Sequence, residues 1–167
     1  ALRVEPAALD RLCQTAIVGP REEKNLRLLA VLAFSASDGE RSGLIGRLNM
    51  GGRWAAVVRD VASVRDSMDR LKDKEIRPSR VVGLLRGLDP AAVEGCAATS
   101  ADPNVRLRLY LYLNELRHVR PVLSGDDVMA LGVPEGPLVG KLLDKLLTAR
   151  LEGLVSTRED EQTFVRR

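Results

Sequence analysis

The residues best suited to bind a ligand lie in the stretch 131–141, which reads LGVPEGPLVGK. Its glycines and prolines predict a turn that ends one helix and begins the next at Pro137. Backbone N–H groups at such a helix start attract a phosphate without any side-chain charge. We therefore expect Gly136, Gly140 and Lys141 to hold a backbone phosphate, as helix-hairpin-helix modules do. The alternative is that these glycines only let two helices pack closely.

Basic side chains lie on both sides of this turn in the sequence. Arg117, His118 and Arg120 cluster just before a proline, and Lys145 and Arg150 follow the turn. We expect these cations to supply charge around the bound phosphate, and His118 to add a hydrogen bond. A structural explanation is open as well, because cations near a helix C-terminus are favoured by the helix dipole whatever the function.

The residue types present in the chain offer little support for catalysis or for metal binding. The chain has one histidine and two cysteines, Cys13 and Cys96, which lie far apart and form no CxxC motif. Zinc sites need closely spaced Cys and His pairs, so we interpret both cysteines as buried apolar groups in a reducing cytoplasm. A nucleophilic triad would have to use His118. We therefore assign no catalytic residue, no metal ligand and no cofactor to this chain.

Two acidic clusters could in principle hold metal ions, but their positions indicate another role. Asp126 and Asp127 follow Ser124, and residues 159–161 follow Thr157. Both patterns predict carboxylates in the first turn of a helix, where they cap it and complement its dipole. Neighbouring helical residues also point about 100° apart, so Asp126 and Asp127 would not converge on one ion.

Composition favours an all-α fold and a nucleic-acid partner. The 167 residues include 27 Leu and 17 Ala but only five aromatic residues, which suits closely packed helices. Of the 26 cationic residues, 21 are arginine, the side chain that binds phosphate with two parallel hydrogen bonds. A GC-rich coding bias would also enrich arginine. No apolar run reaches the ~18 residues of a membrane span, so we expect no membrane contact.

Prolines, glycines and caps predict a bundle of about nine helices. The clearest cover residues 6–18, 21–35 and 54–71, and others begin at Pro78, Asp89-Pro90, Asp102-Pro103, Ser124, Pro137 and Thr157. In 54–71 the spacing also predicts ion pairs of Arg65 with Asp69 and of Asp66 with Arg70. Residues 105–113 alternate as a strand would, but the preceding cap favours a helix. Leu142 and Leu146, which lie on the last long helix, are expected to face the hydrophobic core.

The domain prediction follows from the same punctuation. We expect a helical body in residues 1–76, further body and connecting helices in 77–120, and a tail in 121–167 with a helix-turn-helix-like, glycine-rich turn. The pair Gly51-Gly52, with Val58-Arg59-Asp60 after it, resembles an element of polymerase-type nucleotidyltransferase heads. Its spacing and helical setting differ from that element, so we interpret the likeness as coincidence.

A longer stretch of the chain resembles a known family. The run ELRHVRPVLSGDDVMALGVPEGPLVG, residues 115–140, is similar to the tail of bacterial class II tRNA nucleotidyltransferases, the CCA-adding, A-adding and poly(A)-polymerase-like enzymes. The resemblance continues through 142–144, 149–153 and 157–159 to the last residues. It extends to RPSRVVGLL, residues 77–85, which resembles a proline-started body helix of the family, with Arg80 where an acidic residue is expected.

The resemblance implies an all-α body and tail that hold the acceptor and T arms of tRNA, without catalysis of their own. The family's catalytic head would use Mg²⁺ with ATP or CTP, and we find neither its carboxylate pair nor the nucleotide-templating motif in this sequence. Partners would be tRNA and that head, in the cytoplasm, and a homo-oligomer is possible. The rival interpretation is a helical protein-interaction or oligomerisation domain, using the apolar stripe of 54–71 or 138–151.

Overall fold

The computed structural model describes residues 6–7, 10 and 20–166, and this part of the chain holds nine α-helices, one short 3-10 helix and no strand. The all-α prediction is therefore confirmed. Most of the predicted helix 6–18, with Cys13, lies outside the described residues. The helices are α2 (Arg21–Ser35), α3 (Asp38–Arg47), α4 (Gly52–Leu71), α5 (Pro78–Leu85), α6 (Pro90–Thr99), α7 (Pro103–Asn114), η1 (Leu116–His118), α8 (Gly125–Ala130), α9 (Pro137–Leu151) and α10 (Arg158–Val165).

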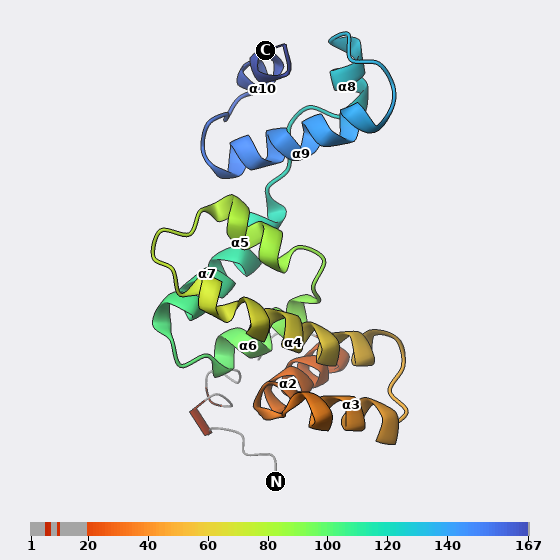
Figure 1. Ribbon diagram of the computed structural model, residues 1–167, viewed down its shortest axis with the longest axis vertical. Helices are drawn as coiled ribbons and strands as arrows, with labels where there is room; N and C mark the ends of the chain where they lie inside the picture. Colours follow the sequence, from red (N-terminus) through yellow and green to blue (C-terminus); the bar gives the residue numbers. More distant parts are fainter. Residues whose placement is uncertain (1–5, 8–9, 11–19, 167) are drawn as a thin grey trace.

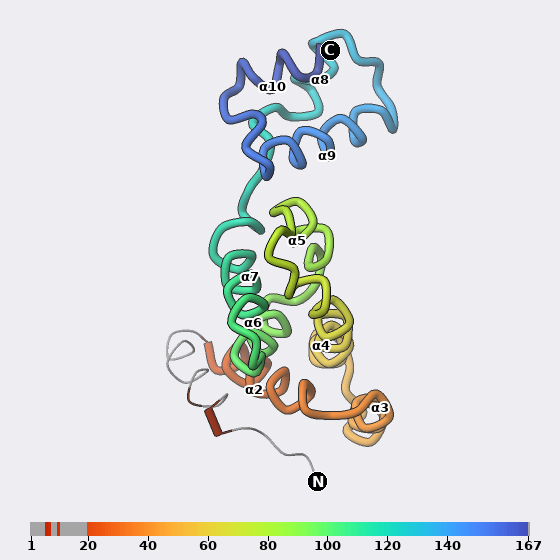
Figure 2. Tube along the Cα trace, turned by 60° about the vertical axis from the view of Figure 1, so that its left-hand side comes forward, coloured from red at the N-terminus to blue at the C-terminus, as the bar shows by residue number. Residues whose placement is uncertain are grey.

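The helices form two groups along the long axis of the molecule. Helices α2–α7 make one group, which we call the body, and α8–α10 make the other, which we call the tail (Figures 1 and 2). After η1 the chain crosses from body to tail as a single extended segment. The two groups are therefore connected covalently at one place only within the described residues.

The body is built around α6, whose small side chains let three helices approach it. Helix α6 packs on α2, α4 and α7, and every residue from Gly95 to Thr99 is buried. A Cβ atom at Gly95 would lie 2.4 Å from the Cβ of Ala30 on α2, so only glycine allows this approach. The core that results includes Val81 and Leu85 of α5. It therefore continues across the boundary predicted near residue 76.

Helix α7 settles the ambiguous pattern of residues 105–113 in favour of the helix. Asp102 caps it by accepting hydrogen bonds from the backbone N–H groups of Asn104 and Val105. Val105, Leu109 and Tyr112 are buried at helical spacing, whereas Leu107 is 66% exposed. The alternation in the sequence therefore reflects one apolar residue left in solvent rather than a strand.

The apolar stripe of α4 is buried as predicted, but its predicted ion pairs are wrong. Arg65 donates to the carbonyl of Ala36 at 2.8 Å and lies over the ring of Phe34, and Asp69 pairs with Lys72. An exposed i,i+4 pair contributes only about 0.2–0.5 kcal/mol. The carbonyl of Ala36 at the end of α2 needs a hydrogen-bond donor, and Arg65 binds it in preference to forming so weak an ion pair.

The tail depends on caps and on one buried carboxylate. Ser124 with Asp127 and Thr157 with Asp160 form capping boxes at the starts of α8 and α10, as predicted. Glu161 of α10 is fully buried and accepts hydrogen bonds from the N–H groups of Val122 and Leu123 at 2.9–3.0 Å. The carboxylate thereby ties α10 to the segment that enters the tail.

Two polar contacts and the packing of α5 on α9 fix the tail to the body. The N–H of Ser79 donates to a carboxylate oxygen of Glu152 at 3.3 Å, and Arg86 pairs with Asp144 at 3.2 Å. These contacts join the start of α5 to the end of α9, and the end of α5 to the middle of α9. Helix α5 therefore lies along α9.

Candidate nucleic-acid interface

The structure brings Arg117, His118 and Arg120 together where the body ends. Helix α7 stops at Asn114, and η1 then turns the chain toward the extended segment before α8. The Nε of Arg117 donates to Nε2 of His118 at 3.1 Å, and Arg120 donates to the carbonyls of Arg117 and Val119 at 2.8 and 2.7 Å. None of these acceptors is a carboxylate, so neither guanidinium group forms an ion pair within the described residues.

These arginines line a cavity of about 320 Å³ between the body and α9. Its other lining residues include Arg86 of the α5 end, Tyr112 and Leu147. The Tyr112 hydroxyl donates to the carbonyl of Leu85 at 3.0 Å, and burial raises the pKa of this phenol, which therefore stays neutral. We call Arg86, Arg117 and Arg120 the junction patch, because they are the ionised groups that line this cavity.

Arg86 was not predicted from the sequence as a site residue. It directly follows α5 and lies far in sequence from Arg117, and only the packing of α5 beside η1 brings them to one cavity. Its partner Asp144 is a largely exposed carboxylate, so the pair is of the weak surface kind. A cation at the C-terminal end of a short helix was the one signal available, and it is too common to identify a site.

Gly136, Gly140, Lys141 and Lys145 form a second group, which we call the α9 patch. Gly136 precedes α9 with φ 145°, a conformation that favours glycine, and no side chain caps the helix. A Cβ at Gly140 would meet nothing within 4 Å, so close helix packing does not explain this glycine. Lys141 and Lys145 are exposed, four residues apart, and neither has an acidic partner in the described chain.

Arg150 differs from the other predicted cations. It pairs at 2.8 Å with Glu161, whose side chain is fully buried. This contact holds α9 against α10, so Arg150 serves the packing of the tail, and its contact with RNA stays a prediction. The helix-turn-helix-like geometry of residues 125–140 stays a prediction as well.

The α9 patch begins away from the junction patch and extends toward it along α9. Leu147 lines the junction cavity, Gly136 directly precedes α9, and Lys145 lies only two residues before Leu147. Eleven residues of helix correspond to about 16 Å. An RNA that contacts both the junction patch and Gly136 must therefore extend along α9.

Acidic side chains in the described ranges do not assemble into a metal site. No group of three or more His, Cys, Asp or Glu side chains in that part of the chain could hold an ion. The carboxylate of Asp127 accepts a hydrogen bond from the N–H of Ser124, which lowers the pKa of this carboxyl. The N–H groups of Thr157 and Ser156 in the same way lower the pKa of the Asp160 carboxyl to about 2. Burial raises the pKa of the Cys96 thiol. No described helix is long and apolar enough to cross a membrane.

Comparison with known proteins finds two relatives among curated sequences. The chain is 39% identical over 88 residues to an A-adding tRNA nucleotidyltransferase of Geobacter sulfurreducens, covering 53% of this chain and 10% of that protein. It is 38% identical over 119 residues to a CC-adding tRNA nucleotidyltransferase of Thermus thermophilus, covering 65% of this chain and 27% of that protein. No family model and no solved structure matches.

These matches confirm the resemblance stated from the sequence. Over part of its length the chain is related to tRNA nucleotidyltransferases, and it spans about a tenth and about a quarter of the two relatives.

Proposed function

We propose that this relative of tRNA nucleotidyltransferases binds tRNA, and that it holds the acceptor and T arms through phosphate contacts. A catalytic head outside this sequence would add nucleotides to the 3′ end, using Mg²⁺ with ATP or CTP, in the cytoplasm. The observation that carries the proposal is the similarity to an A-adding and a CC-adding enzyme. Within such a relative, tRNA is the partner that an arginine-rich surface would serve.

The charges of the junction patch support this proposal. Arg117 and Arg120 donate to no carboxylate among the described residues, so both can donate to a phosphate. A guanidinium binds a phosphate with two parallel hydrogen bonds. Double-helical RNA is held mainly by its phosphates and shape, which requires no aromatic side chain. The α9 patch would supply further contacts through Lys141 and Lys145.

The two apolar stripes of the rival interpretation are largely engaged within this chain. The stripe of α4 is buried in the body core, with Val57, Val61 and Val64 fully covered. In α9, Leu146 is buried and Leu142 and Leu143 pack against it in the tail. Both stripes therefore stabilise this chain itself, which leaves less apolar surface for a protein partner.

Binding to an RNA minihelix that copies a tRNA acceptor stem and T arm tests the proposal. We expect the wild-type chain to bind with an affinity that falls steeply as salt rises. Each lost phosphate contact lowers the slope of log K against log salt by about one, so the double variant Arg117→Ala/Arg120→Ala should lower it by about two, whatever the base sequence. Arg47→Ala, an exposed arginine at the end of α3, far from the tail, is the matched control. A double variant with unchanged affinity and slope would contradict the proposal.

A further inference from the structure

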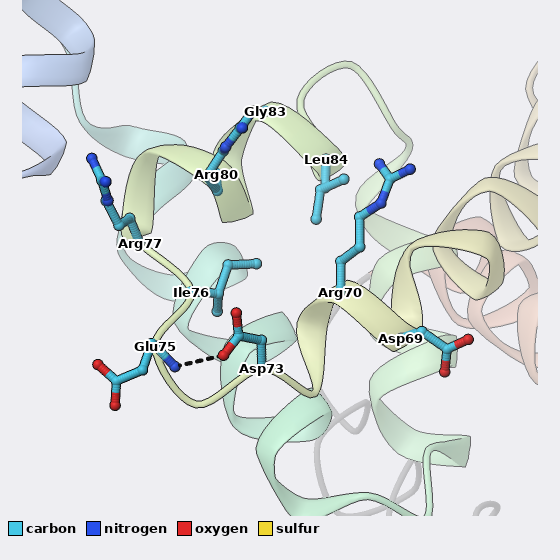
Figure 3. Close-up of a pocket in the computed structure, with 9 residues that line it drawn as sticks. All are labelled: Asp69, Arg70, Asp73, Glu75, Ile76, Arg77, Arg80, Gly83 and Leu84. Carbon is cyan, nitrogen blue, oxygen red and sulfur yellow. Dashed lines mark hydrogen bonds between the residues drawn. The ribbon is translucent and has the colours of Figure 1, made fainter.

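A larger cavity opens on another face of α5, between this helix and the end of α4 (Figure 3). Its volume is about 850 Å³. Arg80 and Leu84 of α5 line it, four residues apart, whereas Val82 and Arg86 line the junction cavity. Helical spacing places these two pairs on different sides of α5. No binding role was predicted from the sequence for this place, which we call the α4–α5 cavity.

Three arginines stand around the α4–α5 cavity without a partner. Arg70, Arg77 and Arg80 are exposed, and none of them makes a hydrogen bond or ion pair with the described residues. Of the acidic neighbours, Asp69 pairs with Lys72 at 2.7 Å, and Asp73 accepts from the N–H of Glu75 at 3.0 Å. The exposed Glu75 lines the cavity as well, but none of the described carboxylates forms an ion pair with the three guanidinium groups, whose hydrogen-bond donors are therefore open to a ligand.

Arginines elsewhere in the body hold its helices together. Arg53 binds the carboxylates of both Glu23 and Asp89, and Arg27 pairs with Glu94 at 2.7 Å. Those pairs join helices of the core. The arginines of the α4–α5 cavity join nothing, and so are free to meet an anion from outside the chain.

The remaining lining of the cavity suits a base rather than a bare anion. Ile76 and Leu84 are partly buried apolar side chains that pack against the body core. Figure 3 shows them between Arg70 and Arg77, with a carboxylate oxygen of Asp73 nearby. A flat apolar base fits such a floor, guanidinium groups stack on bases, and a carboxylate accepts a hydrogen bond from an exocyclic amine. Phosphate, base and amine are the parts of a nucleotide.

We propose that the α4–α5 cavity binds an unpaired nucleotide of the RNA, with its phosphate on the arginines and its base on Ile76 and Leu84. In a duplex the bases are stacked inside the helix, so only a loop, bulge or single-stranded end can place a base there. Arg77 and Arg86 lie at the two ends of α5, about 14 Å apart for nine residues of helix. One RNA can thus occupy this cavity and the junction patch. The inference rests on the proposed function, because it assumes that the chain binds RNA.

A substitution at Gly83 tests the cavity without altering charge. Gly83 lines the cavity within α5, and a Cβ at this position meets nothing within 4 Å. Leucine has a higher helix propensity than glycine, so Gly83→Leu keeps α5 folded while its side chain fills the space. The charge-altering counterpart is Arg70→Ala/Arg80→Ala, and Arg47→Ala is again the matched control. The probes are a single-stranded RNA decamer without self-complementarity and a blunt RNA duplex of the same composition.

We expect Gly83→Leu to weaken binding of the single strand about tenfold or more, as loss of a base-stacking contact does, and to leave duplex binding within about twofold. The double arginine variant should lower the salt slope for the single strand by about 1.4. Unchanged single-strand binding in both variants, with duplex binding intact, would overturn the cavity proposal alone. Failure of the wild type to bind either RNA would overturn the proposed function. Polyglutamate serves as a third probe. If Gly83→Leu weakened its binding as much as that of the single strand, the cavity would be assigned to acidic peptides, and the proposal of a nucleotide site would be overturned.

Discussion

The body and the tail of this chain are held together by different forces. The body core joins 21 buried residues from five helices, and only apolar contacts connect most of them. The corresponding tail cluster has three buried residues, Leu123, Val128 and Leu146. What the tail lacks in apolar burial it replaces with Glu161, which binds two backbone N–H groups and Arg150.

This difference indicates which substitutions should destabilise the body and which the tail. Apolar burial contributes about 25 cal/mol per Å² and is spread over many residues, so one body contact matters little to the whole. A buried carboxylate is concentrated in one side chain, and removing it leaves several polar groups without partners. We therefore expect the tail to open independently of the body, through a few polar groups.

The largest effect should come from Glu161→Ala. It leaves Arg150 and the N–H groups of Val122 and Leu123 without their acceptor, and loss of one partner of a buried ion pair costs about 3–5 kcal/mol. Hydrogen exchange, resolved by segment, should show α8–α10 losing protection while α6 keeps its own. Glu159→Ala, an exposed position of the same helix, should stay within about 0.5 kcal/mol. Equal loss of protection in body and tail would show that they unfold as one unit.

An intermediate effect should separate two leucines that the sequence treats alike. Leu146 is fully buried, so Leu146→Ala should destabilise the tail by about 2–4 kcal/mol. Leu142 is only partly buried, and Leu142→Ala should cost about 1–2 kcal/mol. A urea titration followed by NMR signals of the tail measures both, with Leu154→Ala, at a position 74% exposed, as the control. Equal effects of the two substitutions would show that α9 is rotated relative to this structure.

The smallest effect should appear at acid pH. Backbone N–H groups lower the pKa of Asp127 and lower that of Asp160 to about 2, so both caps are complete above about pH 4, the unfolded value, and weaken as pH falls toward 2. Amide chemical shifts of α8 and α10 should report fraying in that window, while α5, which contains no carboxylate of its own, stays ordered. Asp160→Asn should remove the titration of α10. A helix α10 unchanged down to pH 2 would contradict this role of the cap.

The local features of the fold could be predicted from the sequence. The starts of α6 and α7 follow Asp-Pro pairs, and the capping boxes of α8 and α10 were visible as Ser124 with Asp127 and Thr157 with Asp160. These features depend on residues two to four positions apart, whose geometry the helix itself fixes.

The partners of charged residues could not be predicted in the same way. Arg65 binds a carbonyl 29 residues away instead of Asp69, and Arg86 meets Asp144 58 residues away. Arg150 and Glu161 were both recognised as charged residues, but nothing in their spacing indicated a buried pair. A charged side chain has many acceptors of similar strength, and the fold chooses among them.

By itself the sequence determined the all-α class, most helix boundaries and the resemblance to tRNA nucleotidyltransferases, because caps, prolines and the 3.6-residue period act over one or two turns. Only the tertiary structure decided which cations are free. It placed Arg86 beside Arg117 and Arg120, committed Arg150 to the tail, and opened the α4–α5 cavity between Arg70 and Arg80. The physical reason is that availability of a charge depends on which distant groups the packed helices bring within hydrogen-bonding reach, and local spacing carries no record of that distance.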